Sequence, residues 1–86
     1  MSKTLKNTVL SGKNTFLTEG KAGETYVIKD IINNNEEFRR FLFSLGCYKG
    51  EKISLISILG NSYIIKIKNS RYSINKKLAA IIQIEK

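Results

Sequence analysis

The chain has 86 residues, with 15 Lys and Arg against seven Asp and Glu, which gives a formal net charge of +8. Hydrophobic residues make up 42% and charged residues 26%, as in an ordinary globular protein, so we expect one domain with one modest core. Histidine and tryptophan are absent and Cys47 is the single cysteine, which excludes a Ser-His-Asp or Cys-His relay, a zinc site of four Cys or His ligands, and a disulfide framework. The composition therefore predicts a binding or regulatory module without catalytic residues, cofactor or metal.

The positive charge bears on the partners of the protein rather than on its fold. Nucleic acid, an anionic membrane surface and an acidic protein surface are all compatible with it, and so is a Lys- and Asn-rich composition without functional meaning. The sequence has no run of about 18 apolar residues and no apolar signal segment at its start, so we expect a cytoplasmic protein.

Residues 1–15 carry three lysines and no acidic residue, and their apolar residues follow no period. We expect a basic, mobile N-terminal arm, in which Val9 and Leu10 could dock as a short edge strand. The ordered domain is expected over residues 16–86.

The first half of this domain predicts a strand followed by a helix. Residues 24–32 are rich in aromatic and β-branched residues, which favours a long strand, and residues 33–35 are three asparagines that end it and supply a helix N-cap. A helix is predicted over residues 36–45, and Gly46 stands where a left-handed C-terminal cap is expected. Four apolar residues have the spacing of one buried helical face: Phe38, Phe41, Leu42 and Leu45.

Phe43 does not belong to that face. At 100° per residue it points about 140° away from Phe38, among charged side chains. Either another element of the fold covers Phe43, or the ring faces a partner.

The second half of the domain has the period of strands. Residues 51–59 alternate through Ile53 and Leu55 and then shift phase, which predicts a β-bulge or a sharp bend. Residues 63–67 place apolar side chains on one face and Lys66 on the other.

The remaining strands and the core complete the predicted fold. After a turn at Asn69-Ser70 we expect a strand through Tyr72 and Ile74, one helical turn over 76–80 and a closing strand over 81–85. This order predicts a mainly β fold, a small bent β-barrel of about five strands with one short helix. The expected core contains Phe38, Leu42, Leu45, Ile53, Ile65, Ile67 and Ile82.

The order and spacing of several short motifs over residues 17–86 resemble the FeoA family, although Lys49 stands where that family usually has proline. The matching segments are Gly23-Glu24, the helix end Leu42-Phe43-Ser44-Leu45-Gly46-Cys47, Lys49-Gly50-Glu51-Lys52-Ile53, and Leu78-Ala79-Ala80-Ile81-Ile82-Gln83-Ile84.

The resemblance implies an SH3-like barrel that acts as a cytoplasmic accessory or regulatory protein of bacterial ferrous iron uptake. It implies a partner, the cytosolic GTP-binding region of the iron permease FeoB, and a basic protein beside that permease would also be attracted to the anionic inner face of the membrane. Transition-metal binding is a property associated with such a family, but Fe²⁺ sites favour imidazole and carboxylate ligands and this chain has no histidine. Cys47 takes a position that is apolar in the family, so we expect a small core residue rather than a metal ligand.

Two binding surfaces are candidates. An aromatic patch ringed by positive charge would suit a protein partner; its residues are Arg39, Arg40, Phe43, Tyr48 and Lys49. The alternative function is single-stranded nucleic-acid binding by outward cations; these are Lys66, Lys68, Arg71, Lys76 and Lys77. The tyrosines Tyr63 and Tyr72 have the parity of buried residues, which makes nucleic acid the less favoured partner.

Overall fold

The structure of the protein is a computed structural model that describes residues 15–32 and 35–85. Its elements in chain order are β1 (Thr15–Phe16), the 3-10 helix η1 (Leu17–Glu19), β2 (Glu24–Ile31), α1 (Glu36–Ser44), β3 (Lys52–Leu59), β4 (Ser62–Ile67), β5 (Ser70–Asn75), α2 (Lys76–Ala79) and β6 (Ile82–Glu85). The expected N-terminal arm lies outside the described residues apart from Thr15, and so does the edge strand suggested for Val9 and Leu10.

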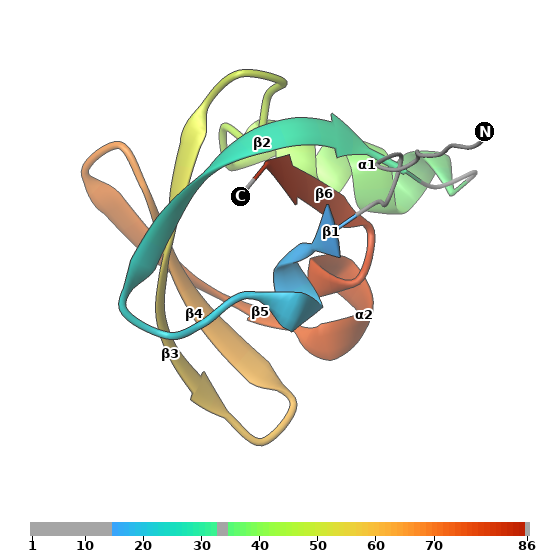
Figure 1. Ribbon diagram of the computed structural model, residues 1–86. Coiled ribbons are helices and arrows are strands. Elements are labelled where there is room, and N and C mark those ends of the chain that lie inside the picture. The colour runs from blue at the N-terminus through green and yellow to red at the C-terminus, as the bar shows by residue number, and fades with distance from the viewer. Residues whose placement is uncertain (1–14, 33–34, 86) are drawn as a thin grey trace, which may run out of the picture.

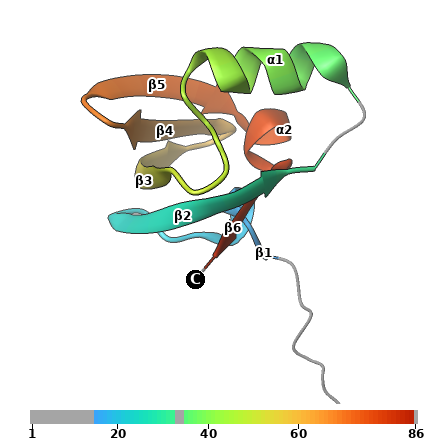
Figure 2. The same cartoon turned by 90° about the horizontal axis from the view of Figure 1, so that it is seen from above.

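The six strands form one antiparallel, strongly bent sheet in the order β1-β6-β2-β3-β4-β5 (Figure 1). α2 contacts β4, β5 and η1, so it packs between the β4–β5 end of the sheet and the segment that follows β1. α1 lies outside the barrel, along one side of it (Figure 2). The expected mainly β fold of about five strands is confirmed, and the described residues form six. The additional strand is β1, which pairs with β6 through Thr15 and Phe16 and is too short to show a period.

The phase shift in β3 is confirmed as an irregularity in its pairing with β4, between Leu55 and Ser57. Ile53 and Leu55 are fully buried before it, whereas Ile58 and Leu59 are exposed after it. A second irregularity, between Ile28 and Asp30 in β2, was not predicted. Its trace in the sequence is the change of parity between the buried Ile28 and Ile31, which sequence reasoning missed.

The turn between β4 and β5 lies one residue earlier than expected. It contains Lys68 and Asn69, and Ser70 already belongs to β5. Lys68 has a φ of 56°, the left-handed conformation that tight hairpin turns require.

Most of the predicted core is buried: Leu42, Ile53, Ile65, Ile67 and Ile82 are at most 2% exposed. Phe38 and Leu45 are only partly buried and pack against the edge of the core, so their assignment to it was wrong. Within α1 the buried residue is Leu42. The helix therefore contacts the barrel along a narrow line through Leu42, and the side chains beside Leu42 remain partly exposed to solvent.

Candidate partner-binding site

The candidate site is formed by α1 and the turn that follows it. The helix begins at the N-cap Asn35, whose side-chain oxygen accepts hydrogen bonds from the backbone N–H groups of Glu37 (2.9 Å) and Phe38 (3.3 Å). Glu36 and Glu37 in the first turn place negative charge at the positive end of the helix dipole. These local interactions fix where the helix starts, as the three asparagines predict.

The helix ends in a Schellman motif that turns the chain back. The Cys47 N–H donates to the carbonyl of Leu42 (3.0 Å) and the Gly46 N–H donates to that of Phe43 (3.0 Å). Gly46 has a φ of +99°, and a Cβ added there would lie 3.3 Å from a methyl group of Ile67, so glycine is required for conformation and for space. The predicted cap is confirmed, and the reversal brings the next residues back toward the helix.

Three of the five candidate residues form one stack. The rings of Phe43 and Tyr48 are 5.9 Å apart between centroids, with planes 28° apart. The Arg39 guanidinium carbon lies 5.4 Å from the centroid of the Phe43 ring, a cation–π contact. Phe43 is partly buried against the core, whereas Tyr48 is 50% exposed. Phe43 is thus covered largely by other residues of the chain, and Tyr48 is the ring available to a partner.

Arg39 also ties α1 to the end of β2. Its Nη1 donates a hydrogen bond to the carbonyl oxygen of Ile31 (2.6 Å), and its Nε lies 3.9 Å from a carboxylate oxygen of Glu36. A guanidinium held at a carbonyl, a carboxylate and an aromatic face has little freedom to move. The stack is therefore rigid before any partner arrives.

The other two candidates are placed differently. Arg40 and Lys49 are exposed, and within residues 15–32 and 35–85 neither takes part in an ion pair or ring contact. They add positive charge near the stack without being fixed to it.

Sequence reasoning misplaced Phe41, which was assigned to the buried face but is 46% exposed. Measured from Leu42, Phe41 and Phe43 lie 100° away on opposite sides of the helix. If Leu42 is taken as the centre of the buried face, the helix geometry predicts that Phe41 lies beside that face, as Phe43 does on the other side. Further exposed apolar residues that were not singled out are Ile32, Ile58 and Leu59.

Cys47 is fully buried, and burial raises the pKa of its thiol from 9.0 to about 12. The thiol therefore stays protonated at neutral pH and is a poor metal ligand. The described part of the chain contains no group of three or more metal-ligating side chains. None of its helices is long and apolar enough to cross a membrane.

The cations considered for nucleic-acid binding are exposed, and Lys66 lies directly opposite Arg71 on the neighbouring strand. Tyr63 is buried and Tyr72 is partly buried against the core, which confirms their inward parity. Tyr63 thus offers bases no ring to stack on beside the cations, and Tyr72 offers only part of one.

Comparisons with known proteins bear on the family and on the fold of the chain. The sequence model of the FeoA domain matches residues 16–86, whereas no curated protein is a significant match. A solved structure of an iron uptake regulatory protein, FeoA, is 23% identical with a TM-score of 0.75, covering 84% of this chain and 96% of that one.

Two further solved structures share the fold. The FeoA of Stenotrophomonas maltophilia complexed with zinc, a prokaryotic SH3 domain protein, is 18% identical with a TM-score of 0.74, covering 83% of this chain and 89% of that one. A manganese-dependent transcriptional repressor is 14% identical with a TM-score of 0.79, covering 90% of this chain and 43% of the repressor. The fold is an SH3-like barrel, as expected.

Proposed function

The chain belongs to the FeoA family, and from this membership we propose that it regulates ferrous iron uptake by binding the cytosolic GTP-binding region of the permease FeoB. The family and the FeoA structures point to an accessory role in ferrous iron transport. The observation that carries the proposal is the family match, which spans almost the whole barrel domain. Iron is the cargo of this system, and the protein acts in the cytoplasm without holding the ion itself.

The rigid stack of Arg39, Phe43 and Tyr48 is the surface we assign to this partner. Aromatic and arginine side chains dominate the energetic centres of protein interfaces. A stack that is already ordered loses little side-chain entropy on binding. Tyr48 presents about half of its surface to solvent, and the exposed Arg40 and Lys49 would meet acidic groups at the rim of the contact.

The protein is proposed to act by binding and not by catalysis. The residues of the stack offer no general base next to a nucleophile, and the thiol of Cys47 is held protonated in the core. Any effect on the permease would then arise from favouring one conformation of its GTP-binding region, which requires a difference in affinity between the two states.

A titration of the full chain into the GTP-binding region of the FeoB from the same bacterium tests the proposal. We expect saturable binding that persists at high salt, because the central contact is aromatic, and a change in the rate of GTP hydrolysis on saturation. An acidic protein without a GTP-binding fold serves as the charge control. Absence of saturable binding, or equal binding to the acidic control, would contradict the proposal.

A further inference from the structure

The β3–β4 hairpin extends beyond the barrel at the end where α2 lies (Figure 1). β2 pairs with β3 only from Lys52 to Leu55, so beyond the irregularity at Leu55 β3 pairs with β4 alone among the described strands. The two residues at the end of β3 are nevertheless apolar and exposed, Ile58 at 38% and Leu59 at 66%. Ile58 lies opposite the buried Tyr63 and so belongs to the inner face, but Leu59 lies opposite Ser62 on the outer face, where packing within the barrel does not account for its apolar character.

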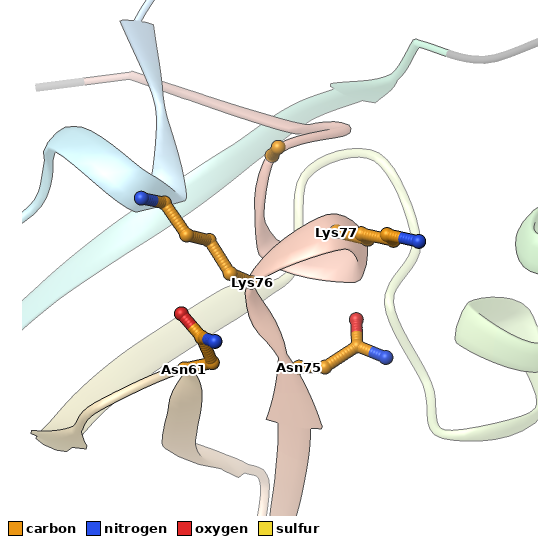
Figure 3. A pocket seen from close by; sticks show the side chains of 5 residues that line it. Asn61, Asn75, Lys76 and Lys77 are labelled. Atoms are coloured by element: carbon orange, nitrogen blue, oxygen red, sulfur yellow. The ribbon is translucent and has the colours of Figure 1, made fainter.

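Two lysines adjoin this hairpin. Ser62 of β4 lies opposite Asn75 of β5, and α2 follows directly with Lys76 and Lys77, both exposed. A hollow of about 440 Å³ lies between the β3–β4 hairpin and α2. It is lined by Asn61, Asn75, Lys76, Lys77 and Ala80. In Figure 3 the side chain of Asn61 lies beside Lys76, while Lys77 extends from the other side of α2.

The segment that forms the β3–β4 hairpin and α2 carries charge of one sign, although Glu24 of β2 lies opposite Leu55 where β2 and β3 pair. Residues 52–84 contain six Lys and Arg and no Asp or Glu. Within the described residues neither Lys76 nor Lys77 forms an ion pair with an acidic side chain. These lysines are therefore available to an anionic surface.

We propose that the Ile58–Leu59 tip together with Lys76 and Lys77 docks on an anionic phospholipid membrane. The apolar tip would enter the boundary between headgroups and acyl chains, while the lysines meet the phosphates. A nucleic acid would leave the aliphatic tip in water, and a second copy of the chain would bring two pairs of lysines together. An anionic bilayer satisfies both the apolar and the charged components.

The proposed membrane contact involves the β3–β4 hairpin and α2, and it does not depend on the proposed FeoB contact, which involves α1. Two apolar side chains and two lysines give weak, reversible attachment. Binding should therefore weaken steeply with salt, since the Debye length is about 10 Å at 0.1 M ionic strength.

Co-sedimentation of the full chain with vesicles provides the test. Vesicles of phosphatidylcholine mixed with phosphatidylglycerol are compared with vesicles of phosphatidylcholine alone, at two salt concentrations. K76Q/K77Q should lower the partition coefficient on anionic vesicles by roughly 30-fold, because each cation near an anionic leaflet contributes about 1 kcal/mol. K52Q/K66Q, which removes the same charge from exposed positions of β3 and β4, is the matched control and should lower it less.

Leu59→Ser should lower the partition coefficient by roughly tenfold, since burial of a leucine side chain is lost. Its apolar control is Phe41→Ser, on α1, which should leave vesicle binding unchanged. Circular dichroism verifies that each variant is folded. Equal losses from the two double variants would reduce the effect to net charge and overturn the proposal, as would absence of binding to anionic vesicles or equal binding to neutral ones.

Discussion

Phe41 and Phe43 lie at equal angles on either side of Leu42, yet the two flanks of α1 differ. Phe43 packs against the core, stacks on Tyr48 and carries Arg39 on its ring, whereas Phe41 is nearly half exposed. The cause is the Schellman turn at Gly46, which returns the chain on the side of Phe43. The connection that follows a helix thus decides which flank is covered, and it creates an ordered aromatic surface on one side only.

The largest effect should come from the side chain between the two flanks. Leu42→Ala removes a fully buried side chain from the line along which α1 meets the barrel. We expect the free energy of unfolding to fall by about 2–5 kcal/mol, measured by denaturant unfolding. A loss below about 0.5 kcal/mol, the range of ordinary surface substitutions, would contradict the placement of this helix face.

The buried thiol next to the turn predicts a dependence on alkaline pH. The pKa of Cys47 is about 12 in the folded protein against an ordinary value of 9.0, so above pH 9 the unfolded chain loses this proton first. The unfolded state then binds fewer protons than the folded state, and stability falls as pH rises from 9 to 12, by at most about 1.4 kcal/mol per pH unit.

This slope is measured by denaturant unfolding at several pH values. Cys47→Ala has no thiol, so it should be less stable at neutral pH because of the cavity but should lose less stability between pH 9 and 12. Parallel curves for the two proteins would show that other groups cause the slope.

Alanine substitutions at the two flanking rings compare the flanks directly. Phe43→Ala should lower the free energy of unfolding by about 1–2 kcal/mol, because the ring is partly buried and stacked. Phe41→Ala should change it by less than about 0.5 kcal/mol, as expected for an exposed side chain. Similar losses measured for the two variants would mean that the turn does not distinguish the flanks.

The sequence predicts those parts of the fold that depend on neighbouring residues. The Asn35 cap, the Gly46 cap, the phase shift after Leu55 and the closing strand are confirmed, because each follows from local hydrogen bonding or from side-chain period. The inward parity of Tyr63 is confirmed for the same reason.

The remaining features depend on contacts between distant segments. β1 exists because Thr15 and Phe16 find a partner in β6, and two residues have no detectable period. Whether Phe38 and Phe41 are buried depends on how closely α1 approaches the barrel. For the candidate site, the sequence indicates the residue types, but the stack of Phe43 and Tyr48 requires the geometry of the turn between them.

The most direct test of the proposed function compares Tyr48→Ala with Phe41→Ala in binding to the GTP-binding region of FeoB. Both variants remove an exposed aromatic ring, and both should fold normally, which unfolding curves verify. We predict that Tyr48→Ala weakens binding by about 1–2 kcal/mol, roughly 5- to 30-fold, while Phe41→Ala leaves it unchanged. Unchanged binding of Tyr48→Ala, or a loss in Phe41→Ala of the same size, would contradict the assignment of the partner to the Phe43 flank.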